Sequence, residues 1–228
     1  MNKFAVIIHL YHFDLWNEIL SYISKYNFDI YITMPKHNIK YINIIQQSYH
    51  DAIIDIVENK GRDILPFLIL INKYDFSKYK FVLKIHTKKS PHTSIGNSWR
   101  TGLYNTLIND NVINNIIENL DNNIGLVGSN KYFNKNFFKN KYLFGNKRKY
   151  YELCKYYNIN KKIADDIEFF AGTMFWISSK IIHKFKEYKI PNNLFIKETG
   201  QIDGETHHAF ERIFIPFVKQ QNMEILKI

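Results

Sequence analysis

The stretch Phe81–Ser90, with the sequence FVLKIHTKKS, decides the fold of this chain. Its apolar first half is typical of a buried strand, and Pro91 prevents that strand from continuing. Lys84 lies inside the apolar run, and further basic side chains follow it. A cation near a core needs an anionic partner, so a phosphate-bearing ligand is one explanation. The other explanation is that Lys84 extends to solvent and the loop is merely hydrated, and this stretch alone leaves both open.

The residues before this stretch alternate between strand and helix patterns. Short apolar or alternating runs predict strands over 4–10, 28–34 and 52–57, and apolar residues at helical spacing predict helices over 14–23 and 39–45. This order favours a mostly parallel sheet with helices on its faces. In such sheets ligands bind beyond the carboxyl ends of the strands. The sequence therefore predicts an α/β fold with a binding site at that edge.

The loop after the third predicted strand points to the same edge. It contains Gly61, which allows close approach of the backbone, and Asp63, which can cap the following helix. Arg62 would project beside the basic residues of the 84–89 stretch if both strands run parallel. Two neighbouring strand ends that carry cations suit a diphosphate better than either does alone.

The second half of the chain is less regular. It predicts helices over 99–108 and 112–120, a strand over 124–129 and an irregular excursion at about 130–165. The apolar run 169–177 contains Gly172 and Thr173, which mark either close approach of a ligand or a structural bulge. Asp203 precedes a predicted helix, where it is either an N-cap or a general base.

Composition bounds the classes of function. The chain has 228 residues, 46% of them hydrophobic, which suits one domain spanning 1–228 and excludes a disordered protein. Its net charge of +10 favours acidic partners: nucleic acid, a polyanionic metabolite or an anionic membrane surface. No helix-turn-helix, zinc-finger or RRM signature supports the first of these, so we expect no nucleic acid partner.

Two further sequence features bear on the compartment. Cys154 is the only cysteine, which excludes an internal disulfide framework and favours a reducing cytoplasm. The N-terminal apolar run ends at His9, too short for a signal peptide or a membrane span. We expect a cytoplasmic protein whose contact with the membrane, at its inner face, is at most peripheral.

Five ordered motifs resemble the rhamnan synthesis protein F family, bacterial glycosyltransferase-like proteins of cell-surface polysaccharide assembly. The motifs are NKGRDILPFL, KIHTKKS, the pair Trp99 and Arg100, FFAGTMFWI and QIDGETHHAFER, and the similarity runs from His9 to Pro216. The resemblance implies a single-domain A-type glycosyltransferase fold. It also implies a nucleotide diphospho-sugar as donor, dTDP-L-rhamnose or one carrying another hexose or deoxyhexose, and a growing glycan or lipid-linked glycan as acceptor.

The motifs and the charge pattern together predict three groups of site residues. Asp203 is predicted to deprotonate the acceptor hydroxyl, which would invert the anomeric centre, with Glu205 and His208 as alternative bases. The residues predicted to bind the donor and its diphosphate are His9, Tyr11, Arg62, Asp63, Lys84, His86, Thr87, Lys88, Lys89 and Ser90. Those predicted to lie near the sugar and the acceptor are Trp99, Arg100, Gly172, Thr173, Glu211 and Arg212.

The chain departs from the expected family pattern at two points. Glu205 stands where the resemblance implies a small hydroxyl residue, and it places a second carboxylate, an alternative base, next to Asp203. The Asp-x-Asp that commonly holds a divalent metal in A-type transferases occurs nowhere in the chain. Fixed cations at the strand ends could offset the leaving diphosphate instead, which predicts transfer without Mg²⁺ or Mn²⁺ and no other cofactor.

Three alternatives stay open at this point. The acidic group of Asp165, Asp166 and Glu168 has metal-ligand chemistry, although charged strand entrances are common. A noncatalytic module that binds nucleotide sugars would share the same cationic edge. A basic domain that binds single-stranded nucleic acid would also combine lysines with aromatic residues.

Overall fold

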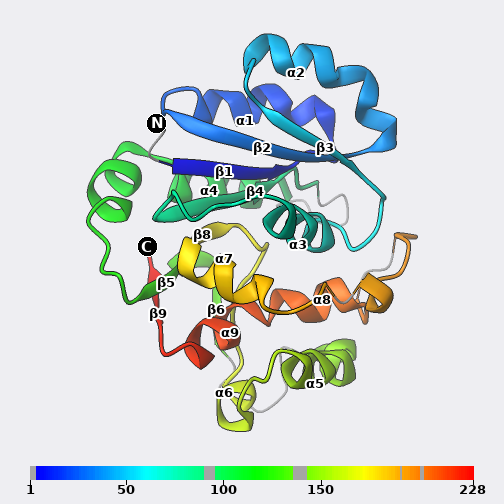
Figure 1. Cartoon of the computed structure of the whole chain (residues 1–228), viewed down its shortest axis with the longest axis vertical. Helices are drawn as coiled ribbons and strands as arrows, with labels where there is room; N and C mark the ends of the chain where they lie inside the picture. The colour runs from blue at the N-terminus through cyan, green and yellow to red at the C-terminus, as the bar shows by residue number, and fades with distance from the viewer. Residues whose placement is uncertain (1–3, 90–95, 136–142, 191, 201–202) are drawn as a thin grey trace.

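The computed structural model describes residues 4–89, 96–135, 143–190, 192–200 and 203–228. Its centre is a seven-stranded sheet in the order β3-β2-β1-β4-β8-β5-β9, with helices on both faces (Figure 1). All pairings in this sheet are parallel except those that β8 makes with β4 and β5. The predicted α/β fold with a mostly parallel sheet is therefore confirmed. In sheet order the strands are Ile53–Val57, Phe28–Pro35, Phe4–His9, Phe81–His86, Phe175–Ser178, Ile124–Gly128 and Glu224–Lys227.

Strand β4 lies in the middle of the sheet, and apolar side chains are buried on both of its faces. All its residues from Phe81 to His86 are buried. Val82 packs against one face of the sheet with Ala5 and Ile7, whereas Leu83 belongs to the apolar cluster on the other face. Successive side chains of a strand point to opposite faces, so a strand buried on both sides needs an unbroken apolar run.

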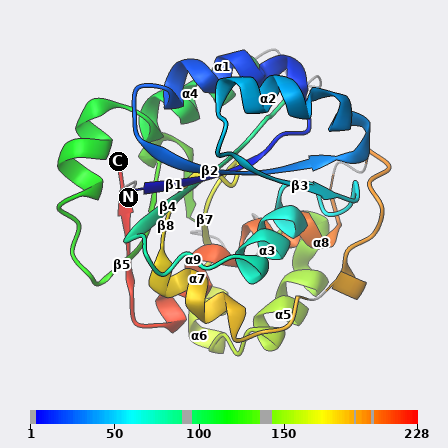
Figure 2. The same cartoon turned by 45° about the horizontal axis from the view of Figure 1, so that its top comes forward.

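The helices divide between the two faces of the sheet, as Figure 2 shows. The elements on one face are α1 (Trp16–Ile23), α2 (Ile42–Ser48), α4 (Gly96–Leu107) and the π-helix η3 (Asn111–Ile117). Those on the other face are α3 (Ile64–Lys73), α7 (Ser179–Lys186) and α9 (Phe214–Gln220). Short 3-10 helices span η1 (Phe13–Leu15), η2 (Lys36–Tyr41), η4 (Asn130–Tyr132), η5 (Phe144–Asn146) and η6 (Asn192–Leu194).

The order of the strands creates a switch point between β1 and β4. From β1 the chain proceeds outward to β2 and β3, and it then returns to pair β4 with the other side of β1. His9 at the carboxyl end of β1 is in register with His86 at the carboxyl end of β4. Open α/β sheets bind ligands in the crevice at such a point, beyond the carboxyl ends of the strands.

The expected irregular excursion at 130–165 is corrected by the structure. Two helices, α5 (Lys147–Tyr156) and α6 (Lys161–Asp165), account for much of it. Strand β6 (Phe133–Lys135) pairs antiparallel with β7 (Glu168–Phe170) in a separate two-stranded sheet. Helix α5 also contacts α8 (Thr206–Glu211), so this segment supports the helix that follows Asp203.

The apolar run 169–177 is not one strand. It forms the end of β7, a turn through Gly172 and Thr173, and the start of β8. Each of the two turn residues has a positive φ, +94° and +50° respectively.

Among the described residues, no helix is long and apolar enough to cross a membrane.

Candidate functional site

The chemical centre of the carboxyl edge is the carboxylate of Asp63. Its Oδ2 atom accepts hydrogen bonds from Lys84 Nζ at 2.5 Å and from Thr173 Oγ1 at 2.6 Å. Lys84 also donates to the Thr173 carbonyl at 2.8 Å. The exposed fractions of the side chains are 1% for Lys84 and 12% for Asp63. The anionic partner that Lys84 requires is thus part of the protein, and Lys84 holds the site together rather than presenting its charge to a ligand.

The charges of this cluster follow from its burial. Burial opposes ionisation of Asp63, but nearby positive charge and the hydrogen bonds from Lys84 and Thr173 outweigh it and hold the pKa of Asp63 well below its usual range. His86 Nδ1 lies 3.4 Å from Asp63 Oδ2 without hydrogen-bond geometry. Burial lowers the pKa of His86 to about 3, so His86 is neutral at pH 7 and Lys84 supplies the countercharge.

Two strained turns meet at this carboxylate. Arg62 and Thr173 both have φ of +50°, which is unusual for residues other than glycine and especially for a β-branched one. Such conformations cost about 1–3 kcal/mol each and persist only where the surroundings hold them. The bonds of Thr173 to Asp63 and Lys84 supply that support. The residue before each, Gly61 and Gly172, also has a positive φ.

Lys88 is a cation of the site that no carboxylate of the described residues neutralises. Its Nζ lies 4.1 Å from the centre of the Trp99 ring. Within the described part of the chain, this ammonium has neither a hydrogen-bond nor an ion-pair partner. Burial lowers its pKa, whereas the charges of Glu211 and Asp63 raise it, so Lys88 lies in the field of the carboxylates that surround the 172–173 turn. The Nε1 atom of Trp99 is buried and also unpartnered.

Trp99 places its N–H beside the turn of β7 and β8. A Cβ atom built on Gly172 would lie 3.5 Å from Trp99 Nε1. The ring of Trp99 stacks on Tyr132 with a centroid distance of 6.0 Å. Trp99 therefore holds the Lys88 ammonium at the carboxyl edge, where a cation without an ion-pair partner among the described residues suits an anionic ligand group.

Glu211 and Arg212 support the 172–173 turn through hydrogen bonds. Glu211 accepts from the Gly172 amide at 2.8 Å through Oε1 and from Arg212 at 2.6 Å through Oε2. Arg212 also lies over the ring of Phe169 at 4.5 Å. Both residues were predicted to lie near the sugar and the acceptor. Their contacts show that they position the turn on which Asp63 depends.

Arg62 is engaged by a residue that the sequence did not single out. Its Nε donates to Glu198 Oε2 at 3.0 Å, and Nη2 lies 3.5 Å from Oε1. The segment around Glu198 is fastened to the loop before Arg62 by the bridge between Lys60 and Lys197. His207 Nε2, buried and without a hydrogen-bond partner, lies 3.9 Å from Glu198 Oε2. Nothing in the spacing of the chain pairs residues that are 136 positions apart.

The predicted bases lie around the start of α8. The N-cap of this helix is Glu205, which forms a capping box with His208, so the sequence alternative of an N-cap at Asp203 is wrong. Glu205 also pairs with Lys149 at 2.6 Å. His208 Nδ1 accepts from the Glu205 amide at 3.3 Å, which puts the proton of the neutral ring on Nε2 and makes that atom a donor rather than a base.

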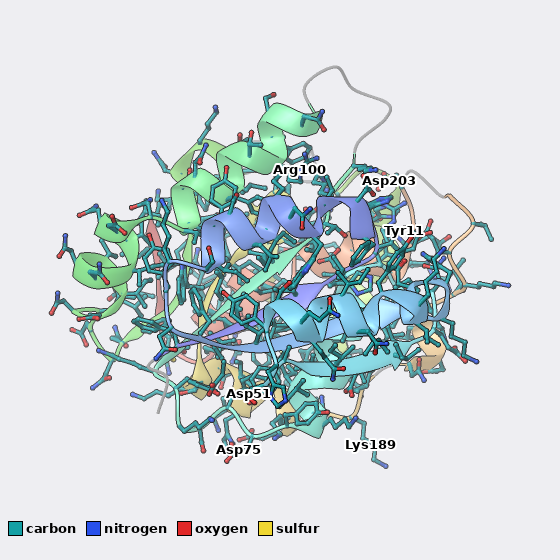
Figure 3. The ribbon with its side chains drawn as sticks, turned by 90° about the horizontal axis from the view of Figure 1, so that it is seen from above. Tyr11, Asp51, Asp75, Arg100, Lys189 and Asp203 are labelled. Atoms are coloured by element: carbon teal, nitrogen blue, oxygen red, sulfur yellow. The ribbon has the colours of Figure 1, made fainter. Side chains whose placement is uncertain are left out.

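Asp203 is exposed and lies at the turn before α8. Its carboxylate accepts from Asn146 Nδ2 at 2.5 Å and from the Gly145 amide at 3.3 Å. Partial burial raises its pKa, but these hydrogen bonds outweigh that effect and the pKa is lowered overall. Figure 3 shows Asp203 on the same side of the molecule as Tyr11 and Arg100.

Three predicted ligand contacts have structural partners instead. Thr87 Oγ1 accepts from the amides of Tyr11 and His12 at 2.9 Å, which fastens the end of β1 to the end of β4. Lys89 pairs with the exposed Asp14. Arg100 is 5% exposed, forms a two-pronged bond with Glu18, and donates to the Lys88 carbonyl at 2.8 Å. Arg100 therefore fixes the backbone that carries Lys88.

The remaining predicted donor contacts lie on β1 and after β4. His9 Nδ1 is 3.0 Å from Thr33 Oγ1 inside the sheet. Tyr11 is half-buried and packs edge-on against His12 and His37, leaving an aromatic group at the end of β1. Ser90 lies outside the described residues.

The acidic group before β7 is neutralised by lysines. Lys135 and Lys219 each lie 2.6 Å from Glu168, and both also approach Asp166. Asp165 accepts from Tyr151 at 3.0 Å. In the ranges that the structure describes, no three metal-ligating side chains gather in one place. The acidic group of Asp165, Asp166 and Glu168 is therefore bound by lysines and a tyrosine of the protein.

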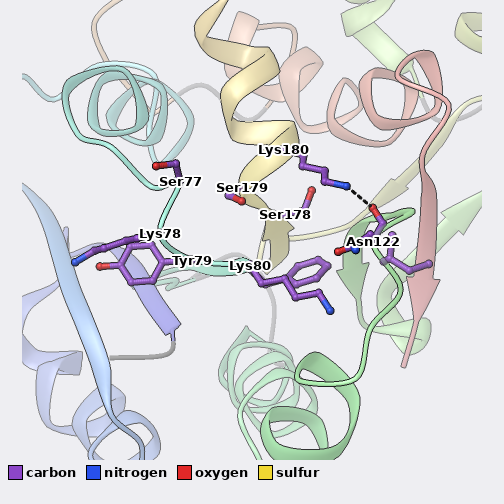
Figure 4. A pocket seen from close by; sticks show the side chains of 10 residues that line it. Ser77, Lys78, Tyr79, Lys80, Asn122, Ser178, Ser179 and Lys180 are labelled. Carbon is purple, nitrogen blue, oxygen red and sulfur yellow. Dashed lines mark hydrogen bonds between the residues drawn. The ribbon is translucent and has the colours of Figure 1, made fainter. Parts of the chain in front are cut away.

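The opposite edge of the sheet has a hollow of another character (Figure 4). Its volume is about 310 Å³, and it lies at Phe81, the amino end of β4. The three lysines that line it have partners in the protein: Lys80 donates to the Leu120 carbonyl at 2.5 Å, Lys180 to the Asn122 carbonyl at 3.3 Å, and Lys78 to the Asp29 carboxylate at 2.9 Å. Because ligands of such sheets bind at the carboxyl ends, we assign the site to the β1 and β4 tips.

The buried histidines predict a loss of stability in acid. Burial lowers the pKa of His9 and His208 to about 4 and that of His86 and His207 to about 3. Each ring is neutral in the fold but binds a proton below pH 6.5 once unfolded. Stability is therefore complete above pH 6.5 and is lost as the pH falls toward the folded pKa values. We expect the free energy of unfolding to drop by about 3 kcal/mol or more between pH 6.5 and 4.

Urea unfolding at a series of pH values measures this loss. His50, whose side chain is fully exposed, supplies the control, because His50→Gln should leave the profile unchanged. The depressed pKa of Asp63 affects stability only at still lower pH. A flat profile between pH 6.5 and 4 would contradict the burial of these rings.

Comparison with known proteins identifies the family of this chain. A sequence profile described as rhamnan synthesis protein F matches residues 1–223. The chain is 28% identical over 214 residues to "Uncharacterized protein WxcX" of Xanthomonas campestris pv. campestris strain B100, and equally to that of strain ATCC 33913. These alignments cover 91% of this chain but only 30% of each relative. Because the profile match covers almost the whole chain, the chain belongs to the rhamnan synthesis protein F family.

Proposed function

We propose that this protein transfers a sugar from a nucleotide diphospho-sugar to a growing cell-surface glycan or lipid-linked glycan. The family's description supports a role in rhamnan synthesis, and rhamnose carried by dTDP is the donor we propose. The observation that carries the proposal is Lys88, a partly buried ammonium without an ion-pair partner in the described chain, at the carboxyl edge of the switch point. The net charge of +10 suits the anionic inner face of the membrane, where a lipid-linked acceptor would be found.

The proposed fold is that of an A-type glycosyltransferase. It is supported by the single central sheet with helices on both faces, by the mostly parallel direction of its strands, and by strand β8, which runs antiparallel to β4. In this fold the diphosphate would lie over the tips of β1 and β4. Lys88 would offset its charge, and the ring of Trp99 would hold the Lys88 ammonium in position.

Some cations at this edge have a carboxylate partner and others do not. Fewer of them than the sequence predicted can therefore bind the diphosphate. Lys84, Lys89 and Arg62 are neutralised by Asp63, Asp14 and Glu198, so they do not add free charge at a ligand. Lys88 is left as the residue that stabilises the leaving diphosphate. We still propose transfer without a divalent metal. Full activity in excess chelator is the expected result, and loss of activity that Mn²⁺ restores would contradict it.

A ligand screen followed by a turnover assay tests the proposed function. Ligands that bind the native state raise its melting temperature by mass action, so nucleotides and nucleotide sugars can be compared directly. We expect nucleotide diphospho-sugars to stabilise the protein and to be consumed in the presence of an acceptor glycan. Binding without any turnover would instead favour a noncatalytic module. Failure of every nucleotide to bind would refute the proposal.

Replacing Lys88 should weaken the binding of a nucleoside diphosphate. Hydrogen bonds to charged groups are worth about 1.5–3 kcal/mol, so Lys88→Ala should raise the Kd for dTDP by about 10- to 100-fold. Lys89→Ala is the matched control, because the neighbouring Lys89 is paired with Asp14 and should change the Kd by less than about 2-fold. Isothermal titration measures both. Equal effects of the two variants would remove the special role of Lys88.

A further inference from the structure

We propose that Asp63 recognises a hydroxyl group of the donor sugar through its open Oδ1 oxygen and thereby determines which sugar is accepted. This inference rests on the proposed function. It assigns Asp63 to specificity rather than to proton transfer.

The geometry leaves one oxygen of Asp63 for a ligand. Both hydrogen bonds from Lys84 and Thr173 end on Oδ2, and the contact with His86 is also to Oδ2. Among the described residues, none donates to Oδ1. The Asp63 side chain is 12% exposed, so its carboxylate is not closed off from a ligand at the carboxyl edge of the sheet.

The chemistry of the open oxygen selects the kind of group that it binds. Asp63 stays ionised because its pKa is held well below the usual range, so it is a hydrogen-bond acceptor and a weak proton acceptor. A carboxylate repels phosphate, which instead suits the neighbouring Lys88 ammonium. The remaining donors on a nucleotide sugar near the diphosphate are hydroxyl groups, and an ionised acceptor binds a hydroxyl more strongly than a neutral one does.

The support of Asp63 makes the contact selective. Its carboxylate is fixed by a buried lysine and by a strained turn residue, so it cannot move to follow a sugar whose hydroxyl points elsewhere. A site built to bond a hydroxyl rejects analogues that lack it far better than an apolar pocket rejects an extra group. The 172–173 turn and its brace Glu211 therefore take part in specificity by positioning Asp63.

Two affinities separate this role from other roles of Asp63. The Kd values of dTDP and dTDP-L-rhamnose are measured for the wild type, for Asp63→Asn and for the double variant Asp63→Asn/Lys84→Met. The double variant avoids an unpaired buried ammonium, so an effect that both variants share comes from loss of the carboxylate. We expect both variants to bind dTDP-L-rhamnose about 10- to 100-fold more weakly than the wild type does, with the Kd of dTDP changed by less than about 3-fold.

The outcomes distinguish this inference from the proposed function. If dTDP and dTDP-L-rhamnose weaken equally, the hydroxyl belongs to the nucleoside or Asp63 is only structural, and the inference is overturned. An unchanged affinity for both also overturns it. If the wild-type protein binds neither these ligands nor UDP and UDP-glucose, the proposed function itself fails. Circular dichroism of both variants confirms that the fold is retained during the titrations.

Discussion

We expect the Asp203→Asn variant to bind the donor as tightly as the wild type and to transfer the sugar about 10²- to 10⁴-fold more slowly, the usual contribution of a general base. Of the three carboxylates around α8, Asp203 is the exposed one, which makes it accessible to a large acceptor. Glu205 and Glu211 are tied to Lys149 and to the Gly172 amide. The lowered pKa of Asp203 keeps it unprotonated at neutral pH.

The neighbouring Glu205 supplies a matched control for this prediction. Glu205 caps α8 and pairs with Lys149, so Glu205→Gln should lower the melting temperature while leaving the transfer rate per folded molecule within a few-fold of the wild type. Steady-state kinetics with an acceptor glycan, together with the Kd of the donor, measures both variants. A normal rate for Asp203→Asn with a large loss for Glu205→Gln would move the base to Glu205.

The second large effect concerns stability. Lys84→Ala should lower the free energy of unfolding by about 3–5 kcal/mol, because it leaves the Asp63 carboxylate buried without its countercharge and opens a cavity in β4. Adding Asp63→Asn should recover part of that loss, since the remaining partner is then uncharged. Urea unfolding of the single and double variants measures the coupling.

The alternative for Lys84 makes the opposite prediction. If Lys84 extended to solvent, as one reading of the sequence allows, Lys84→Ala would change stability by less than about 1 kcal/mol and the double variant would show no recovery. Lys78, in the loop between α3 and β4, provides the comparison. It pairs with Asp29 at 2.9 Å while remaining about half exposed, so Lys78→Ala should have only a small effect.

The sequence was informative about strands because apolar runs and their alternation depend on neighbouring residues. The run Phe81–His86 reads as a buried strand and is one, and the order of strands and helices before it predicts a parallel sheet. The same local signals failed in 130–165, where polar and aromatic residues hide helix α5 that is stabilised by contact with α8. They also joined β7 and β8 into one run, because a turn with positive φ at Thr173 leaves no pattern in the sequence.

For the site, the sequence showed which residues carry charge but not which residues neutralise that charge. From the sequence we expected Arg62, Lys84, Lys88 and Lys89 at one edge, and nothing distinguished one of these cations from another. Structure separates them by partner: Glu198 for Arg62, Asp63 for Lys84 and Asp14 for Lys89. The sequence did not single out Glu198, which lies outside every motif, or His207, which lies in the QIDGETHHAFER motif but was given no role there.

By itself, then, the sequence determined an α/β sheet with basic residues after two of its strands, because apolar patterns and basic runs are read from neighbouring residues. The prediction that these two strands are neighbours was wrong, because β2 and β1 lie between β3 and β4. Tertiary structure alone decided which charged side chains pair with one another. The physical reason is distance along the chain: Thr173 lies 110 positions from the Asp63 that it supports, and Glu198 lies 136 positions from Arg62. Such pairs meet only when the sheet has formed, and among the described residues they leave Lys88 and Asp63 Oδ1 without a hydrogen-bond or ion-pair partner.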